Sequence, residues 1–181
     1  MAKTLAGETA VRAATAEGGL PPVHLWNPPF CGDIDMRIAR NGTWFHDGTP
    51  IGRLEMVRLF STILKREGDR YFLVTPVEKV GITVEDAPFV AVDVAQEGAD
   101  LAFVTNVGDR VVAGPDHPIR VERDTASGEP SPYVLVRRDL WALIDRKTFY
   151  RLVDLGAVEG AWFGVRSGGA FFPMILSADL G

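Results

Sequence analysis

The stretch CGDIDMRIARNGTWFHDGTPIGR holds the side chains of this sequence that are best suited to chemistry. Asp33 and Asp35 are carboxylates on alternate residues, a spacing at which one face of a strand can offer both to a divalent cation. Arg37 and Trp44 add a permanently charged guanidinium and a large flat ring. These residue types predict either a metal site at the Asp pair or a surface that stacks a planar ring and neutralises an anion.

Asn41-Gly42 within this stretch predicts a type I′ hairpin turn, because Asn and Gly both adopt positive φ readily. With these two as the only loop residues, Ile38 pairs with Phe45 and Arg37 with His46. The core face then carries Ile34, Met36, Ile38 and Phe45, and the outer face carries Asp35, Arg37, Trp44 and His46. A second interpretation stays open, in which Trp44 covers a minor core and the charged residues form a solvated cluster.

Composition limits the class of protein. The chain has 181 residues, of which 46% are hydrophobic and 24% are charged, as in ordinary globular proteins. Its net charge of -5 disfavours nucleic acid and anionic membranes as partners. The single cysteine, Cys31, excludes an intramolecular disulfide. The longest apolar run, Ala170 to Leu176, is far shorter than the roughly 20 residues of a membrane helix. We therefore expect a soluble, cytoplasmic protein without a cofactor.

Two periodic segments predict helices. Apolar residues recur every three or four positions over 53–67, and Gly68 follows. A second helix is expected over 145–155, with Asp145 as its N-cap and Gly156 at its end. Strands are expected at 71–75, 80–84, 88–94, 100–105, 110–113, 118–123 and 132–137, in addition to the hairpin. Together these elements predict an α+β fold.

A faint internal repeat predicts two related units. Residues 38–42 can be laid on residues 104–108, after which each copy reaches a second glycine at the same interval, Gly48 and Gly114. The predicted organisation is a lead-in segment at 1–20, an N-terminal α+β domain at 21–90 and a β-rich C-terminal α+β domain at 91–181.

Signatures of catalysis are missing from the sequence: it contains no GxSxG, HExxH, P-loop or GxGxxG motif. A non-enzymatic module is therefore favoured over an enzyme. A metal-assisted enzyme that uses Asp33 and Asp35 on a phosphorylated substrate stays open, as does a protein-interaction adaptor.

Several motifs in this order resemble the bacterial domain-of-unknown-function family 1285. They are CGDIDMRIARNGTWFHDGTPIGR, LVTPVEK, VEDAPF, the Thr105-Asn106 pair and PYVLVRRDLWALIDRKTFYRLV. The resemblance runs from about Pro21 to about Phe163. It implies a two-domain α+β protein with a duplicated core of mostly antiparallel sheets, each with one main helix, and a C-terminal domain superficially similar to pleckstrin-homology folds.

The resemblance implies no established activity. For this family, a nucleotide-like ligand between the two domains and a role in signal transduction have been inferred. Carried onto this sequence, the ligand-binding residues would be Arg37, Trp44, Arg53, Glu78, Lys79, Thr105, Asn106, Arg137, Arg146 and Tyr150. In this interpretation the cations bind an anionic group, and Trp44 or Tyr150 stacks a base. The alternative role for each is to hold the two domains together.

Overall fold

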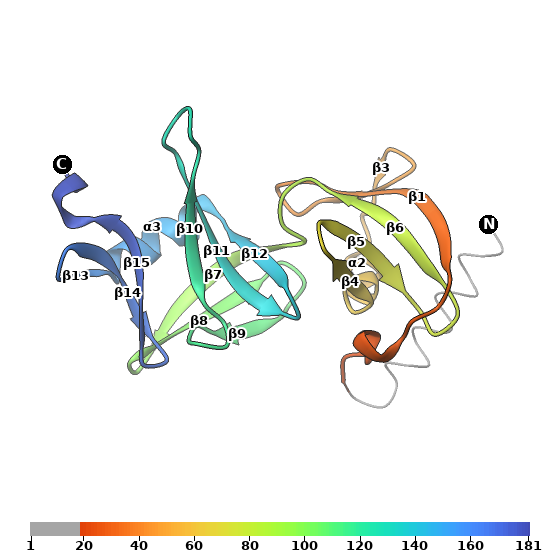
Figure 1. Ribbon diagram of the computed structural model, residues 1–181, viewed down its shortest axis with the longest axis horizontal. Helices are drawn as coiled ribbons and strands as arrows, with labels where there is room; N and C mark the ends of the chain where they lie inside the picture. The colour runs from red at the N-terminus through yellow and green to blue at the C-terminus, as the bar shows by residue number, and fades with distance from the viewer. Residues whose placement is uncertain (1–18) are drawn as a thin grey trace. The chain divides into compact units, whose positions relative to one another are not determined.

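The computed structural model describes residues 19–181, which form two compact units (Figure 1). The boundary between the units in the sequence lies between Glu85 and Asp86. We call them the N-terminal unit and the C-terminal unit. Each is rich in β-sheet and has one α-helix, as the α+β prediction requires. The lead-in expected at residues 1–20 lies outside the described residues except for its last two positions.

The N-terminal unit is built around one six-stranded mixed sheet. Its strands run in the order β3-β2-β1-β6-β5-β4, with β1 and β6 parallel and the other neighbours antiparallel. Its elements are the 3-10 turn η1 (Val23–Leu25), β1 (Phe30–Ile38), β2 (Trp44–His46), β3 (Thr49–Pro50), α2 (Leu54–Ser61), β4 (Leu64–Glu67), β5 (Arg70–Val74) and β6 (Lys79–Val84).

The helix predicted over 53–67 is wrong in its second half, because α2 ends at Ser61. The hydroxyls of Ser61 and Thr62 donate to the carbonyls of Arg58 and Leu59, both at 2.6 Å, and thereby close the last turn. The residues that follow form β4 and pair with β5. Gly68, at φ 61°, belongs to the turn between these strands. Ile63 and Leu64 are buried in the observed fold. Their apolar side chains also fall at the spacing of a helix, and for this reason the predicted helix extended too far.

The C-terminal unit contains a six-stranded sheet and a three-stranded sheet, in the orders β10-β11-β12-β7-β8-β9 and β13-β14-β15. Its elements are β7 (Phe89–Glu97), β8 (Asp100–Thr105), β9 (Arg110–Val112), β10 (Ile119–Arg123), β11 (Pro130–Arg137), β12 (Leu140–Ile144), α3 (Arg146–Asp154), β13 (Ala157–Glu159), β14 (Trp162–Ser167), β15 (Ala170–Leu176) and the 3-10 turn η2 (Ser177–Asp179). The predicted N-cap is confirmed, because the Asp145 carboxylate accepts a 2.9 Å hydrogen bond from the Thr148 backbone N–H.

The two large sheets share one topology. In each, three strands form a meander, three more form a second meander, and the first and sixth strands pair in parallel at the centre. By this order β1 corresponds to β7. The proposed overlay of residues 38–42 on 104–108 is therefore out of step by one strand, because it places the end of β1 on the end of β8. The helices do not repeat, since α2 precedes the fourth strand of its unit and α3 follows the sixth.

One buried hydroxyl joins the two sheets of the C-terminal unit. Ser167, at the end of β14, accepts a 2.8 Å hydrogen bond from the backbone N–H of Leu101 and donates a 2.7 Å hydrogen bond to the carbonyl of Ala113. The backbone N–H of Gly168 also donates to Asp100 at 2.8 Å. The small sheet is thus fixed to the ends of β8 and β9. Among the described residues, no helix is long and apolar enough to span a membrane.

Candidate functional site

The hairpin at Asn41-Gly42 has a different register from the predicted one. Ile38 pairs with Trp44 rather than with Phe45. Hydrogen bonds from Gly42 N to Ala39 O (2.9 Å) and from Ala39 N to Thr43 O (2.8 Å) enclose a loop of three residues, not two. Gly42 alone among these loop residues has positive φ, at 89°. A three-residue loop that ends in a left-handed glycine shifts the pairing by one residue. Because strand side chains alternate, this shift moves each side chain of β2 to the sheet face opposite the predicted one.

The predicted outer face is therefore wrong for Trp44. This side chain is only 1% exposed and stacks on Phe60 of α2, with ring centroids 6.3 Å apart and an interplanar angle of 20°. Phe45, expected in the core, instead lies under the Arg37 guanidinium, whose central carbon is 4.1 Å from the ring centroid. Ile34, also expected in the core, is 38% exposed. Trp44 supports the fold and has no surface on which to stack a ligand.

Arg37 is held within its own unit by Glu85. Its Nη1 lies 2.6 Å from Glu85 Oε1, while the backbone N–H of Arg40 donates to Glu85 Oε2 at 2.9 Å. The hydrogen bond from Arg40, followed by that from Arg37, lowers the pKa of the Glu85 carboxyl. The end of β6 is thereby fixed to the first hairpin.

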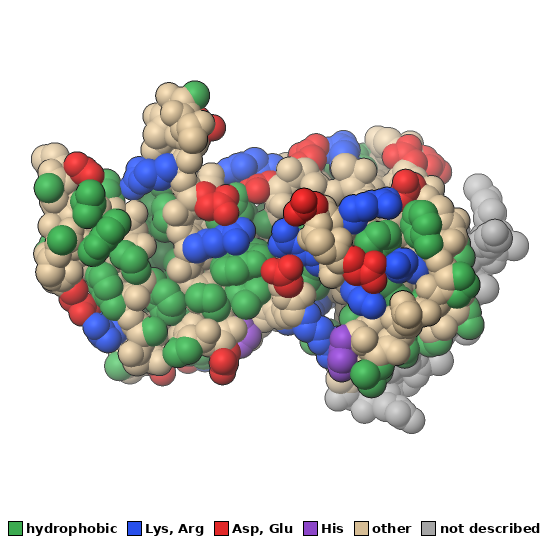
Figure 2. Space-filling model, in the orientation of Figure 1, with side chains coloured by type: hydrophobic (Ala, Val, Ile, Leu, Met, Phe, Trp, Pro, Cys, Tyr) green, Lys and Arg blue, Asp and Glu red, His purple; other side chains and the backbone are tan. Residues whose placement is uncertain are grey.

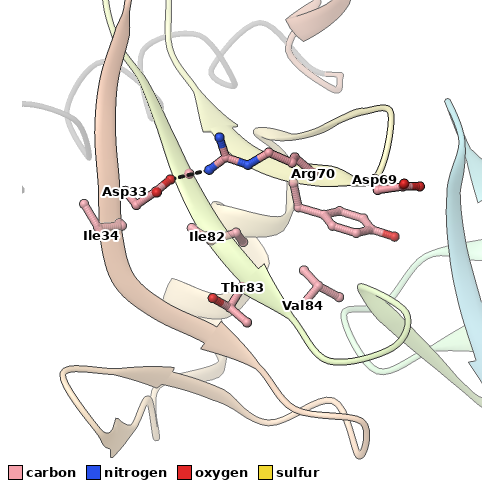
Figure 3. A pocket seen from close by; sticks show the side chains of 9 residues that line it. Asp33, Ile34, Asp69, Arg70, Ile82, Thr83 and Val84 are labelled. Atoms are coloured by element: carbon pink, nitrogen blue, oxygen red, sulfur yellow. Dashed lines mark hydrogen bonds and ion pairs between the residues drawn. The ribbon is translucent and has the colours of Figure 1, made fainter.

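A pocket lies over β6, with β1, which bulges beside it, on one side and β5 on the other. Asp33 pairs with Gly81 and Arg37 with Thr83, so three residues of β1 stand against one residue of β6 between these pairs. The pocket has a volume of about 320 Å³ (Figure 3). It is lined by Asp33, Ile34, Asp69, Arg70, Tyr71, Gly81, Ile82, Thr83 and Val84. All of these residues belong to the N-terminal unit.

Gly81 makes the charged part of this pocket possible. Asp33 reaches from β1 and Arg70 from β5, and the two form an ion pair across β6 (Figure 3). A Cβ on Gly81 would lie 2.0 Å from Asp33 Oδ1 and 2.8 Å from Arg70 Nη2. Any larger residue at this position must push the two charged groups away, so the pair depends on the missing side chain.

Aromatic rings fix the Arg70 side chain. Its guanidinium carbon lies 5.5 Å from the ring centroid of Phe30 and 5.0 Å from that of Phe72. The two rings contact each other edge to face, with centroids 5.9 Å apart. These contacts restrict the guanidinium and leave it beside the cavity, so a ligand that binds Arg70 orders little additional side chain.

A second ionic cluster lies on the same sheet. Lys79 Nζ and Lys65 Nζ lie 2.9 Å and 3.4 Å from the two oxygens of Glu67. Lys79 is also 4.7 Å from the ring centroid of Phe72. The hydrogen bond from Lys79 lowers the pKa of the Glu67 carboxyl against a smaller opposing effect of burial. Figure 2 shows acidic and basic side chains intermixed on the face of the N-terminal unit that is turned to the viewer.

Three predicted residues of the C-terminal unit come together at the turn after β8. The Thr105 hydroxyl accepts a hydrogen bond from the Asp109 backbone N–H at 3.1 Å. Asn106 exchanges two hydrogen bonds with the backbone of Val90, at 2.8 and 3.0 Å. Arg137 forms a 2.5 Å ion pair with Asp109. These contacts order a turn and its neighbouring strand.

The remaining predicted residues lie apart from this turn. Arg53 is the exposed N-cap residue of α2. Glu78 donates its backbone N–H to the Thr75 hydroxyl at 3.1 Å in the turn before β6. Arg146 and Tyr150 lie one turn apart on α3, where Tyr150 is 60% exposed. Of the ten predicted residues, Arg37 and Lys79 share the sheet face of the Asp33–Arg70 pair, whereas Trp44 lies on the opposite face.

Comparison with known proteins places both units in one family. The family model described as "Domain of unknown function (DUF1285), N-terminal domain" matches residues 21–87, and the one described as "Protein of unknown function (DUF1285), C-terminal domain" matches residues 88–174. This chain belongs to the DUF1285 family. The resemblance noted in the sequence motifs is thereby confirmed.

Two crystal structures of DUF1285 proteins are similar to this chain. One, from Silicibacter pomeroyi DSS-3 at 2.50 Å resolution, is 64% identical, has a TM-score of 0.86 and covers 94% of each chain. The other, from Shewanella baltica OS155 at 1.40 Å resolution, is 32% identical, has a TM-score of 0.52 and covers 66% of this chain and 90% of its own. No curated protein matches this chain.

The candidate site of this DUF1285 protein differs from the one predicted by its motifs. Asp33 and Ile34 lie within the first motif, but Arg70, Phe72 and Gly81 lie outside all of the motifs. A glycine inside the otherwise strand-like segment KVGITV was the signal that could have indicated a close approach of other groups. The metal site considered at Asp33 and Asp35 gains no support, because Arg70 neutralises Asp33. Within residues 19–181, no three His, Cys, Asp or Glu side chains form a group that could hold a metal ion.

Proposed function

We propose that this protein is a non-catalytic ligand-binding module and that the pocket beside Gly81 holds the ligand. The observation that carries the proposal is the ion pair of Asp33 and Arg70 over the α-carbon of Gly81. The pair lies at the edge of a cavity, and its cation is held against two aromatic rings.

Stability alone is a poor explanation of this arrangement. A glycine within a strand costs roughly 0.5–1 kcal/mol relative to alanine. An exposed ion pair returns about 0–1 kcal/mol, and both side chains here are more than half exposed. The bulge adds backbone that does not pair with β6. The sheet thus gains little from the glycine, the bulge and the pair, whereas a binding site gains a preorganised charge beside a hollow.

The properties of the pocket restrict the ligand. A volume of about 320 Å³ lies at the lower end of the range for small-molecule sites, so the ligand is small. The fixed guanidinium of Arg70 calls for an anionic group on that ligand. A nucleotide-like ligand between the two units, and a role in signal transduction, stay predictions from the family resemblance. The pocket proposed here lies within one unit.

A thermal-shift screen of the full chain tests this proposal. The library should contain small carboxylates, phosphates, amino acids and mononucleotides. A ligand present at about 100 times its Kd adds about 2.7 kcal/mol to the free energy of unfolding. We expect at least one compound to raise the Tm of the parent protein and to lose this effect in Arg70→Gln.

Arg110→Gln is the matched control for Arg70→Gln. Arg110 also forms an exposed ion pair, with Glu97, and its side chain is 52% exposed compared with 54% for Arg70. It lies in the other unit and does not line the pocket. A Tm shift that survives in Arg70→Gln, or a screen without any shift, would contradict the proposal.

A further inference from the structure

The chemistry of the pocket also indicates the class of ligand. We infer that the ligand is a small zwitterion, with an acidic group and a primary amine only a few bonds apart, for which an α-amino acid is the simplest example. This inference rests on the proposed function and names the chemistry of the same site.

The charges that line the pocket favour a ligand that carries both signs. Two carboxylates, Asp33 and Asp69, line the cavity beside a single guanidinium, Arg70. A ligand with several negative charges would meet one cation and two anions, and the interaction with the anions is repulsive. A ligand that also carries a positive charge matches both signs, because its amine lies on a carboxylate while its acidic group lies on Arg70.

Several polar groups of the pocket have unused hydrogen-bonding capacity. Within residues 19–181, the only polar partner of the Asp33 side chain is Arg70, which contacts its Oδ1. In the same part of the chain, the side chains of Asp69 and Thr83 have no polar partner. Asp33 Oδ2 and the Asp69 carboxylate can therefore accept hydrogen bonds, and the remaining N–H groups of Arg70 can donate them. An ammonium donates three hydrogen bonds and a carboxylate accepts them, so the two ends of a zwitterion complement these groups.

The spacing of the charged pair limits the distance between the charged groups of the ligand. Asp33 and Arg70 are in contact, so the groups that bind them must also be close together. The ammonium and carboxylate of an α-amino acid are separated by one carbon atom, and each can lie on the oppositely charged member of the protein pair. Such binding keeps the protein ion pair and adds two further attractive contacts.

The size of the pocket limits the side chain of the ligand. Ile34, Ile82 and Val84 are among the lining residues, but Ile82 and Val84 alternate with Gly81 and Thr83 along β6, so their side chains do not share the sheet face of the Asp33–Arg70 pair. At roughly 30 Å³ for each water molecule, the cavity has room for about ten waters, which is enough for a small side chain but small for a dinucleotide.

The test compares matched compounds on the full-length protein by thermal shift and isothermal titration calorimetry. The probes are the L-α-amino acids with aliphatic side chains, their N-acetyl derivatives, their amides and the mononucleotides. We expect one or more free amino acids to raise the Tm by about 5–10 °C at 100 times the Kd. The N-acetyl derivative lacks the cation and the amide lacks the anion, so each should bind at least tenfold more weakly.

Variants assign the two ends of the ligand. Asp33→Asn should weaken the binding of the free amino acid and reduce the ratio of its affinity to that of the N-acetyl form. Arg70→Gln should reduce the ratio of its affinity to that of the amide. The control pair, Glu97→Gln and Arg110→Gln, should leave both preferences unchanged. Binding of mononucleotides would overturn the zwitterion inference and leave the proposed site in place. Equal affinity for the N-acetyl and the free amino acid would do the same. A blank result with every compound would overturn both.

Discussion

Asp33 Oδ1 lies 2.0 Å from the position that a Cβ would take on Gly81. This relationship makes Gly81→Ala a specific test of the site. The φ angle of Gly81 is not positive, so alanine can adopt its backbone conformation. The methyl group should displace the Asp33 carboxylate and separate it from Arg70. The stability lost with an exposed ion pair and the stability gained from alanine over glycine in a strand nearly cancel. We therefore expect the free energy of unfolding, measured with urea, to change by less than about 1 kcal/mol. A loss above about 2 kcal/mol would show that Gly81 serves packing instead.

Trp44 is a core residue, and its removal should destabilise the protein strongly. Trp44→Ala leaves a large cavity against Phe60, and we expect a loss of about 3–5 kcal/mol in the free energy of unfolding. Trp44→Phe should cost less, because it keeps a ring and removes an indole N–H that has no hydrogen-bond partner among the described residues. Chemical denaturation measures both. Equal stability of Trp44→Ala and the parent would favour the surface position that the two-residue loop predicts.

Ser167 should be important for the stability of the C-terminal unit. Ser167→Ala removes the hydroxyl that satisfies a buried backbone N–H and a buried carbonyl, so we expect a loss of about 2–3 kcal/mol. Ser177→Ala is the control, because that hydroxyl makes one exposed hydrogen bond, to Ala161. Urea unfolding followed by circular dichroism compares the two variants. Similar small losses in both would contradict the role assigned to Ser167.

The Glu67 cluster predicts a dependence of stability on pH. The pKa of Glu67 in the folded protein lies below the usual value of 4.5, chiefly because of the hydrogen bond from Lys79. A lowered pKa favours the ionised form in the folded state, so its contribution to stability is complete above pH 4.5 and is lost as the pH falls through the folded pKa. The stability difference between the parent and Glu67→Gln should therefore shrink as the pH falls.

The measurement for this prediction is the free energy of unfolding between about pH 3 and pH 6, a window around the ordinary Glu pKa. Glu129→Gln, in an exposed loop, provides the control for the loss of any one carboxylate. A difference between the parent and Glu67→Gln that stays constant across this range would contradict the assigned effect of Lys79.

Local patterns predicted much of the fold. The strand predicted over 100–105 matches β8, and the cap at Asp145 begins α3 where predicted. The Asn41-Gly42 turn was placed correctly, but its loop length was not, because glycine at a positive φ suits loops of two or three residues. Two-residue loops with positive φ at both positions lie instead at Asp47-Gly48, Arg138-Asp139 and Gly168-Gly169. The residue types of the first and third are typical of such a loop, whereas those of Arg138-Asp139 do not indicate it.

The candidate site was harder to predict, because long-range pairing creates it. Asp33 and Gly81 are neighbours only when β1 pairs in parallel with β6, and no local pattern determines that pairing or its bulge. Arg70 reaches Asp33 only across the intervening strand. The family motifs identified Arg37 and Lys79 on the same sheet face, but Glu85 and Glu67 pair with them.

The most direct test of the central claim is the ligand-induced Tm shift measured side by side in the parent protein, Gly81→Ala and Arg110→Gln. The pocket beside Gly81 predicts that an aliphatic α-amino acid raises the Tm of the parent and of Arg110→Gln by about 5–10 °C at 100 times its Kd, and leaves that of Gly81→Ala unchanged. An equal shift in all three proteins, or no shift in any of them, would contradict it.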